Sequence, residues 1–331
     1  MRKMPAPQNF MRRMGQAAFA AALAFCVSHA HADSYPTRPV RIIVPYGAGG
    51  IADVTMRLVA QDLSQRFGQQ FFIENRPGAA GVVGMQAALE APSDGYTLVM
   101  IGGGLTIAKA LFKHLPYNIE TDFTPISTTA SYGLVVASKA GSPYQTVTDV
   151  IAAAKAHPGT LNFGTINAGS SQNLSAELFR TQAGLDVTII PYKTTPDLAN
   201  AVLRGDVDVA FEYFAGFQSF VTNGQMSVLA TTGSERASNL PNVPAVSESG
   251  LPGYEVTSWN GLAVRSGTPA GIVTELNRAV IAALKTPEVQ AFSKKAGMDA
   301  SGMPPVDLSI RIKNDVAKWM SVIDKAHIPR R

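Results

Sequence analysis

The sequence predicts an α/β fold with two domains, and three observations support this. The chain has 331 residues, which is more than one small core organises and suits two domains of about 100–200 residues each. Hydrophobic residues make up 46% of the chain and charged residues only 16%, so apolar side chains are available to fill large cores. Short β-branched runs alternate with segments of helical period, which is the pattern of parallel sheets covered by helices.

The first part of the chain shows this alternation clearly. A β-branched run at Val40–Val44 predicts a strand, and a tight glycine loop follows it at residues 47–50. Apolar residues at three- and four-residue spacing then predict a helix that stops at a glycine: Met56, Val59, Leu63 and Phe67. We expect two further strands, Phe71–Ile73 and Thr97–Ile101, separated by a small-residue helix that runs through Leu89.

The middle of the chain repeats the alternation of helices and strands. We expect helices at Asp149–Ala156, Leu174–Gln182 and Asp197–Arg204, and strands at Leu161–Gly164, Val187–Pro191, Val207–Phe211 and Val228–Thr231. The stretch Leu240–Tyr254 is rich in Pro, Gly and Ser, which predicts a long surface connection. One short strand at Leu262–Val264 precedes a tail of helices only, the last of them near Asp307–Lys325.

The first 32 residues predict a secretory signal. A basic stretch precedes the apolar run Ala17–Val27 and the small-residue end Ala30–Ala32, so we expect cleavage after Ala32. The apolar run is too short for a membrane anchor. A lipoprotein signal centred on Cys26 is a rival interpretation, but the bulky Phe25 stands where such a signal needs a small residue. We therefore expect a periplasmic protein.

The charge balance argues against a nucleic-acid partner. The formal charge of +4 arises in the signal, because removal of its four basic residues leaves 24 basic against 24 acidic residues. No basic patch then remains for phosphate backbones. Cleavage also removes Cys26, the single cysteine, which excludes disulfides and cysteine-bound metal in the mature chain. The remaining histidines are too scattered for a short zinc motif, and we expect neither metal nor cofactor.

Three loops, each between a strand and a helix, are candidates for a ligand site: residues 45–53, 101–106 and 165–173. Glycine lets the backbone approach a ligand, and free N–H groups at the following helix start favour an anion. Such loops lie at the carboxyl ends of strands, where α/β sheets bind ligands. Ordinary turn chemistry is the alternative for any one loop, with Ser170 or Ser171 as a helix cap and Asp53 complementing a helix dipole.

The first loop also resembles a dinucleotide fingerprint, because Gly47-x-Gly49-x-x-Ala52 follows a strand and Glu74 ends the next one. We do not favour an NAD enzyme, since an exported protein meets little NAD and no hydride-transfer partner lies beside the loop. The hydrolase motif Gly-x-Ser-x-Gly does not occur in the sequence. Lys193 fits an exposed loop lysine better than a Schiff-base lysine. We expect no catalytic residue.

A series of short motifs runs in order along the mature chain: Tyr35–Pro45, Glu74–Ala79, Asp94–Leu98, Leu115–Tyr117, Leu161–Gly164, Pro191–Lys193, Leu240–Pro244 and Glu248–Val256. With these motifs the chain resembles the extracytoplasmic solute receptors of tripartite tricarboxylate transporters, the Bug type. The last of them is especially specific. The resemblance implies a type II periplasmic binding protein, in which two α/β domains joined by a two-crossing hinge enclose a small ligand.

The resemblance also gives domain limits and partners. Hinge crossings near Leu134–Val136 and Trp259–Val264 assign residues 33–134 and 262–331 to domain 1 and residues 135–261 to domain 2, with the C-terminal helices packed on domain 1. The implied partners are a small organic carboxylate and the membrane subunits of a tripartite transporter, and we expect a non-enzymatic monomer. A periplasmic enzyme or a ligand-sensing protein on the same fold is the alternative.

The family holds a carboxylate between the first loop and the loop after a strand of the middle domain. Carried onto this sequence, the resemblance implies as ligand-binding residues Tyr46, Gly47, Ala48 and Gly49, with Asp53 as loop support, then Asn167, Ser170 and Ser171. We further expect ligand-binding residues in the second loop, Gly103 and Thr106, and where the ligand's distal end lies, Asn173, Glu212 and Tyr213. Two helix N-termini that face one carboxylate would supply N–H donors without a formal cation, in agreement with this placement.

The sequence departs from the family pattern where the distal end of a ligand is expected. Asn173 stands where a His is frequent, Glu212-Tyr213 replaces an Asp-Asn pair, and Asn260 replaces an aromatic residue after the tryptophan. Transport of the usual dicarboxylates is therefore in doubt. A buried Glu212 needs a donor, which we expect on the ligand as an amine, an amide N–H or a hydroxyl. The alternative is that Glu212 turns to solvent and Tyr213 lines the site.

Overall fold

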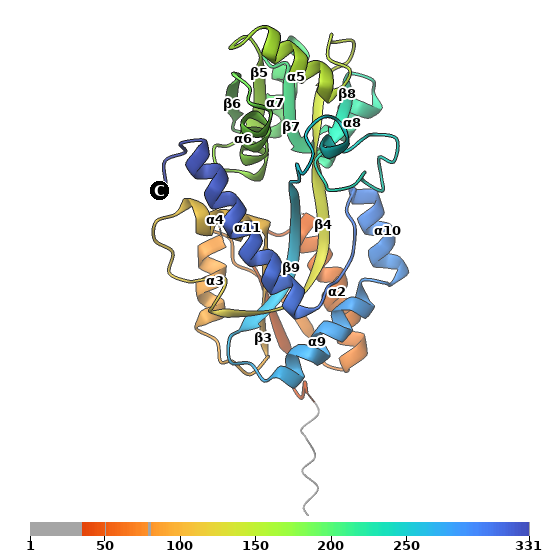
Figure 1. The fold of residues 1–331 in the computed structure, drawn as a ribbon. Coiled ribbons are helices and arrows are strands. Elements are labelled where there is room, and N and C mark those ends of the chain that lie inside the picture. Colours follow the sequence, from red (N-terminus) through yellow and green to blue (C-terminus); the bar gives the residue numbers. More distant parts are fainter. Residues whose placement is uncertain (1–34, 50, 79–80, 331) are drawn as a thin grey trace, which may run out of the picture. The chain divides into compact units, whose positions relative to one another are not determined.

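The computed structural model describes residues 35–49, 51–78 and 81–330 (Figure 1). The predicted signal, with Cys26 and the cleavage site after Ala32, lies outside these residues, and its processing stays a prediction. Among the described residues, no helix combines the length and the apolar character needed to cross a membrane.

The strands form one mixed sheet with two halves that share a long strand. The first half consists of β2 (Phe71–Asn75), β1 (Val40–Val44), β3 (Thr97–Gly102), β9 (Thr257–Arg265) and β4 (Phe123–Lys139), in this order. The strands β2, β1 and β3 are parallel, and β9 is antiparallel to both β3 and β4. The second half adds β7 (Val209–Tyr213), β5 (Asn162–Ile166), β6 (Thr188–Tyr192) and, on β4, β8 (Met226–Thr231).

The long strand β4 changes partners in its middle. Gly133 of β4 pairs with Thr257 of β9, whereas from Leu134 onward the strand pairs with β7 and β8. Pro125 lies at a register shift of the β4–β9 pair, where the backbone N–H that proline lacks is not needed. A single strand therefore runs through both halves of the sheet, as Figure 1 shows.

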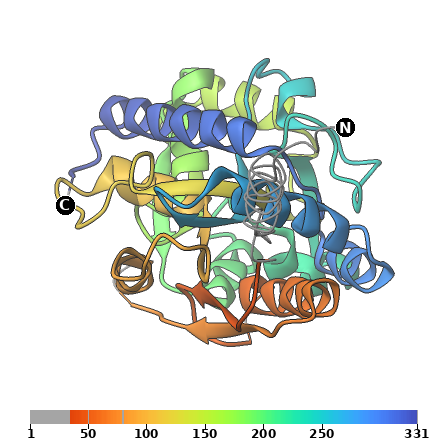
Figure 2. The ribbon, with the colours of Figure 1, turned by 90° about the horizontal axis from the view of Figure 1, so that it is seen from below.

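Helices cover both halves of the sheet. The first half carries α2 (Ile51–Phe67), α3 (Val82–Leu89), α4 (Gly103–Leu111), α9 (Ala270–Ala283), α10 (Pro287–Ala296) and α11 (Pro305–Lys325). The second half carries α5 (Val147–Ala156), α6 (Ser171–Ala183), α7 (Thr195–Arg204) and α8 (Phe214–Thr222), and a short 3-10 turn lies at Val246–Glu248. Figure 2 shows α11 on one side of the β4–β9 pair and α2 on the other.

The last helix, α11, packs on two hydrophobic cores. Leu308 and Val316 join the core of β1, β3, α3 and α4. Trp319 and Ile323, further along the same helix, join the core of the second half around Phe179. The C-terminal tail is helical, as the sequence predicts, but its contacts extend beyond the first half.

Most predicted elements are confirmed, with ends that shift by a few residues, whereas α4, β4 and α8 were missed. The β4 segment contains Pro125 and Gly133 and a Ser/Thr run, so it lacks a clear apolar alternation. Both α4 and α8 begin directly after a strand, at Gly103 and Phe214; the glycines at the first junction predicted a loop, and no turn residue marks the second. The short strand expected at Leu262–Val264 is the last part of β9.

Candidate functional site

Four helices begin at the carboxyl ends of strands, and three of them, α2, α4 and α6, each contribute a first-turn residue to one cavity. The four helices are α2 after β1, α4 after β3, α6 after β5 and α8 after β7. The cavity has a volume of about 220 Å³ and is lined by Tyr46, Ala52, Gly104, Tyr132, Ser171, Tyr213, Ser258, Trp259 and Asn260. Each helix N-terminus presents free N–H groups and the positive end of its dipole. The arrangement therefore suits an anion.

No charged side chain lines this cavity among the residues that the structure describes. Its polar groups are the hydroxyls of three tyrosines and two serines and the amide of Asn260. No group of three or more His, Cys, Asp or Glu residues that could hold a metal ion occurs in the described parts of the chain. An anion at this place would be held by neutral donors and helix dipoles.

Two loops at the cavity are built in the same way. In the loop before α2, Oδ2 of Asp53 accepts the N–H of Gly49 at 2.9 Å. In the loop before α6, Oδ1 of Asn173 accepts the N–H of Gly169, also at 2.9 Å. Both glycines have left-handed backbone, with φ of 84° and 80°, which suits residues without Cβ. A polar side chain four residues after the glycine fixes each loop.

Asp53 is buried and fully engaged. Besides Gly49, its carboxylate accepts bonds from Arg57 Nε at 2.9 Å and from Asn75 Nδ2 at 2.8 Å. Burial alone would raise the pKa of Asp53, but the hydrogen bonds from Arg57, Gly49 and Asn75 outweigh it and hold the pKa below its ordinary value. Asp53 thus supports the loop, which is the role the sequence predicts for it.

Several predicted site residues use their hydroxyls within the protein. Ser170 caps α6: its Oγ accepts the N–H of Asn173 at 3.1 Å and donates to the carbonyl of Ile166 at 2.5 Å. The buried Thr106 donates to the carbonyl of Gly103 at 2.8 Å, inside the first turn of α4. The hydroxyls of Ser170 and Thr106 therefore serve the helix starts.

Apart from Glu212, which is described below, the predicted residues divide into three groups. Those that line the cavity are Tyr46, Ser171 and Tyr213. Those that shape its loops and helix starts are Gly49, Asp53, Gly103, Thr106, Ser170 and Asn173. Gly47, Ala48 and Asn167 are exposed on the two loops. Ligand contact by any of them stays a prediction.

The sequence interpretation missed Tyr132, Ser258 and Trp259 as lining residues. Tyr132 lies in β4, next to the change of partners at Gly133, and the other two lie in β9. No glycine-rich loop marks these positions, because they reach the cavity from within strands. Asn260 was singled out only as a departure from the family pattern, and that departure lies at the cavity wall.

Tyrosine hydroxyls dominate the wall of the cavity. The rings of Tyr132 and Tyr213 meet edge to face, with centroids 5.3 Å apart, and Ser258 hydrogen-bonds to both side chains. Burial raises the pKa of Tyr46, Tyr132 and Tyr213 above the ordinary value. These hydroxyls therefore stay protonated at neutral pH, and that of Tyr132 donates to Asn260 Oδ1.

Asn260 has one side-chain atom without a partner. Its Oδ1 accepts a hydrogen bond from the hydroxyl of Tyr132 at 3.3 Å. Its Nδ2 is buried and has no hydrogen-bond partner, and the residue as a whole is 3% exposed. A buried donor without an acceptor costs about 1–3 kcal/mol, so this amide is an unfavourable polar group beside the cavity.

Glu212 lies below the cavity wall and not in it. The side chain is buried, and its Oε1 accepts bonds from Gln172 Nε2 and from the N–H of Tyr213, both at 2.8 Å. Its Oε2 accepts the hydroxyl of Thr195 at 2.9 Å. Burial raises the pKa of Glu212, against the effect of these donors. Glu212 faces neither the cavity nor solvent, whereas its neighbour Tyr213 lines the cavity.

A second cavity of about 210 Å³ adjoins the first. It shares Ala52, Tyr132 and Tyr213 with the first cavity and is otherwise lined by Gly133, Phe214, Ala215, Ala296, Gly297 and Met298. We call the first the polar cavity and the second the apolar cavity.

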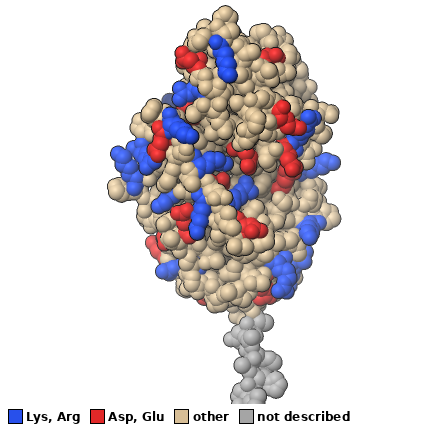
Figure 3. Space-filling view, viewed as in Figure 1, with Lys and Arg blue, Asp and Glu red and all other residues tan. Residues whose placement is uncertain are grey.

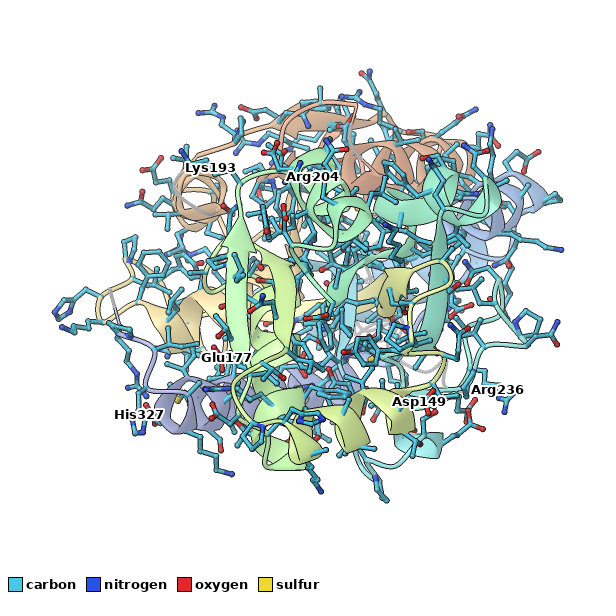
Figure 4. All side chains as sticks on the ribbon, turned by 90° about the horizontal axis from the view of Figure 1, so that it is seen from above. Asp149, Glu177, Lys193, Arg204, Arg236 and His327 are labelled. Atoms are coloured by element: carbon cyan, nitrogen blue, oxygen red, sulfur yellow. The ribbon has the colours of Figure 1, made fainter. Side chains whose placement is uncertain are left out.

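A larger groove, of about 690 Å³, lies beside α11 and the segment 233–240. Its lining contains five Asp or Glu residues against three Lys or Arg residues, a balance that disfavours an anion. Figure 3 shows the two signs of charge intermingled over this face. Figure 4 shows Lys193, Arg236 and His327 at the periphery of the molecule, and Lys193 is exposed, as the sequence predicts.

Comparison with known proteins gives the family. The model of the tripartite tricarboxylate transporter family receptor matches residues 55–328. The chain belongs to this receptor family. The fold is accordingly that of the two-domain periplasmic binding proteins, as predicted, and the receptors of this family are periplasmic.

Individual relatives agree along most of the chain. Protein BugT of Bordetella pertussis is 30% identical over 295 residues, which cover 88% of this chain and 90% of that protein. The structure of Rpa4515 from R. palustris with adipate is similar with a TM-score of 0.72 and 32% identity, over 89% of this chain and 99% of that one. MatC (Rpa3494) from Rhodopseudomonas palustris, with bound malate, has a TM-score of 0.68 and 29% identity, over 87% of this chain and 100% of that one.

Proposed function

We propose that this receptor binds a small organic carboxylate in the polar cavity and delivers it to the membrane subunits of a tripartite transporter. The observation that carries the proposal is the convergence of three helix N-termini, those of α2, α4 and α6, on a cavity lined by neutral donors. Carboxylates occupy two structurally similar members of the family, Rpa4515 with adipate and MatC with malate. We also propose that the receptor is a monomer and that it has no catalytic role.

Ligand capture would involve a hinge between domain 1, residues 33–134 and 262–331, and domain 2, residues 135–261. The change of partners in β4 between Gly133 and Leu134 supports the first crossing. Because β9 pairs with the first half from Thr257 onward, we place the second crossing just before that residue, earlier than Trp259–Val264. The contact of α11 with both cores would restrict the amplitude of this motion.

The part of the ligand beyond its anchored carboxylate needs partners of its own. Glu212 does not need an amine on the ligand as its partner, because this carboxylate already has three donors from the protein. The proposal therefore keeps the anchored carboxylate and does not include an amine. A distal hydroxyl or amide N–H has acceptors available in the tyrosine and serine hydroxyls of the polar cavity.

Binding without turnover tests the proposal. A ligand that binds only the folded protein stabilises it by about 2.7 kcal/mol at a hundredfold excess over Kd. A carboxylate library screened by thermal shift should yield stabilising ligands, and mass spectrometry should recover them unchanged after prolonged incubation. Time-dependent conversion of such a ligand would favour the enzyme alternative, and a screen without any stabilising carboxylate would contradict the proposal.

The proposed export can be tested by measuring the mass of the mature protein. We propose export with cleavage after Ala32, which makes Asp33 the first mature residue. The intact mass of protein from the periplasmic fraction should correspond to a chain that starts at Asp33. A mass that retains residues 1–32, or a lipid on Cys26, would contradict this.

A further inference from the structure

One buried threonine joins the two chain crossings of the proposed hinge. Thr232 directly follows β8 and is fully buried. Its hydroxyl accepts the N–H of Leu134 at 2.8 Å and donates to the carbonyl of Val256 at 2.7 Å. Leu134 lies where β4 changes partners, and Val256 directly precedes β9. The segment that starts at Thr232 is therefore rooted at the hinge itself.

The residues that follow, 233–240, reach from this root to the first half of the sheet, and we call them the strap. Oγ of Ser238, near the tip of the strap, donates to Oδ1 of Asp299 at 2.8 Å. Asp299 is fixed to β4 in the first half, because its backbone N–H and carbonyl bond to Ser131 at 2.8 and 2.9 Å. The strap thus joins the two halves outside the sheet.

A second contact of the strap lies beside the first. Gly297 ends α10 in the first half with a left-handed backbone, φ 69°. A Cβ at this position would lie 2.8 Å from Nδ2 of Asn239 in the strap and 3.7 Å from Cδ1 of Phe214 at the start of α8. Gly297 and Phe214 also line the apolar cavity from opposite halves. Glycine therefore allows an approach between the halves that a larger side chain would prevent.

The two ends of the strap differ in how easily they separate from their partners. At the root, Thr232 is buried, so loss of its bonds would leave polar atoms unpaired. Arg236 also forms an ion pair with Glu248 at 3.0 Å, within the second half. At the tip, Ser238 and Asp299 are exposed, so water can replace their hydrogen bond at little cost. A rotation of one half against the other would leave the root in place and release the tip.

Both halves line the polar cavity in this arrangement. Tyr46 and Ser258 belong to the first half, and Ser171 and Tyr213 belong to the second. A contact that holds the halves together therefore also keeps this cavity enclosed. If such a contact forms without a ligand, it raises the population of the enclosed state, and a ligand that binds this state gains affinity in the same proportion.

We propose that the strap is a clasp between the two halves: through Ser238 and Asn239 at its tip it stabilises the enclosed arrangement of the polar cavity before a ligand binds. This inference rests on the proposed function, because it uses the hinge proposed there, and it names what regulates the closure of that site. Because the tip contacts are few and exposed, the clasp shifts the equilibrium between open and enclosed states severalfold and does not lock it.

The distance between two spin labels measures this equilibrium without any ligand. The predicted mature chain has no cysteine, so Lys155→Cys in α5 and Arg278→Cys in α9 provide one labelled position in each half. Both positions are exposed and lie outside the strap. For the labelled protein with its native strap, pulsed electron paramagnetic resonance should show a major distance that matches the structure and a minor population at a second distance.

Two variants remove the tip contacts one at a time. Ser238→Ala deletes the hydroxyl that bonds to Asp299, and it alters only an exposed side chain. Gly297→Asn places a side chain against Asn239, and asparagine tolerates the left-handed backbone better than other residues with a Cβ. Each variant should raise the ratio of the second population to the first by about threefold or more, which is within the effect of one hydrogen bond.

Each variant has a matched control. Ser234→Ala makes the same change at another exposed strap residue, which bonds to Ser247 through its carbonyl. Gly184→Asn repeats the glycine substitution at the end of α6, where φ is 61° and a Cβ would meet nothing within 4 Å. Both controls should keep the native ratio of populations.

Three outcomes would overturn the clasp. They are unchanged populations in both tip variants, equal shifts in the variants and their controls, and a native strap without a population at the distance of the structure. Because the measurement contains no ligand, none of these outcomes bears on carboxylate binding, which the thermal-shift screen decides separately.

Discussion

Asp53 and Asn173 occupy equivalent positions in two different loops, and each accepts the N–H of the glycine four residues before it. The loops precede α2 and α6, two of the helices that face the polar cavity. One residue is a carboxylate with three donors, and the other is an amide that also donates, to Thr165 Oγ1 at 3.4 Å. The same loop shape is thus fixed by a charged side chain in one half and by a neutral one in the other.

The substitutions Asp53→Asn and Asn173→Asp should have unequal effects on the free energy of unfolding. Asp53→Asn replaces one acceptor oxygen by an NH₂ group that faces the donors Arg57 or Asn75, so at least one bond is lost. We expect a loss of about 1–3 kcal/mol in the free energy of unfolding, measured with denaturant. Asn173→Asp keeps the acceptor for Gly169 and adds a negative charge near the start of α6, so its effect should stay within about 1 kcal/mol. Equal losses in both variants would contradict this difference.

The contribution of Asp53 should also depend on pH in a defined direction. Its pKa in the folded protein lies below the ordinary value of 3.8, so the folded state favours the carboxylate. The stabilisation is complete above 3.8 and is lost as pH falls through the lower, folded pKa. The difference between wild type and Asp53→Asn should therefore shrink in acid. A difference that grows in acid would contradict the assignment.

Features that leave a local pattern in the sequence were predicted, whereas features that depend on the pairing of distant segments were missed. The strand Val40–Val44 and the loop before α2 are local patterns of β-branched residues and glycine, and both occur as expected. Tyr132 and Ser258 reach the cavity only because β4 and β9 are paired in a particular register, Tyr132 opposite Ser258. Register between distant strands is a tertiary property that a single sequence does not reveal.

The hydrogen-bond partners of Glu212 are another feature that the sequence alone does not reveal. The sequence indicated that this carboxylate, directly after a predicted strand, would need a partner if buried, and the side chain is buried. The partners are Gln172, from the first turn of α6, and Thr195, from the start of α7, together with the next backbone N–H. Because they come from three separate elements, only the three-dimensional structure reveals that the demand is met without a ligand.

Glu212→Gln should fit the same set of partners. Glutamine can keep one oxygen for Gln172 and the N–H of Tyr213 and donate its NH₂ group to the hydroxyl of Thr195. Ligand affinity should stay within about twofold of wild type, because the side chain does not line the cavity. A loss of about 1.5–3 kcal/mol for an amine-bearing ligand alone, measured by calorimetry, would restore the ligand-facing interpretation.

The stability of Glu212→Gln should vary with pH in the sense opposite to that of Asp53→Asn. Burial raises the folded pKa of Glu212 above its ordinary value of 4.5, so the protonated form is favoured on folding. Its contribution is complete below 4.5 and is lost as pH rises through the folded pKa. Relative to wild type, Glu212→Gln should gain stability between acid and pH 8, whereas Glu212→Ala, which leaves three donors unpaired, should be less stable throughout. A relative loss by the Gln variant towards pH 8 would contradict this.

The tyrosines of the polar cavity should keep binding insensitive to alkali. Burial raises the pKa of Tyr46, Tyr132 and Tyr213 above 10.0, so their hydroxyls remain donors where exposed tyrosines ionise. We expect ligand affinity to show no decline at the pH where an ordinary tyrosine is half ionised, about 10, while the protein remains folded by circular dichroism. A decline in affinity that follows an ordinary tyrosine titration would show that at least one of the three ionises in the site.

Asn260 and Asn277 provide a matched pair that separates a ligand contact from a structural one. The amide nitrogen of Asn277 donates to the carbonyls of Ile126 and Met303 at 2.7 and 2.9 Å, whereas that of Asn260 has no partner. Asn260→Leu removes an unpaired donor together with the acceptor of the Tyr132 hydroxyl, so the stability of the unliganded protein should change by no more than about 1 kcal/mol, while the loss of an amide from the wall of the polar cavity should lower ligand affinity at least tenfold. Asn277→Leu should lose about 1–3 kcal/mol of stability and retain affinity, because two carbonyls lose their donor far from the cavity. Urea unfolding and calorimetry on both variants measure the two effects. A destabilised Asn260→Leu with unchanged affinity would make this amide a structural group, because a polar group that acts on the ligand is one whose loss leaves the free protein stable and the complex weak.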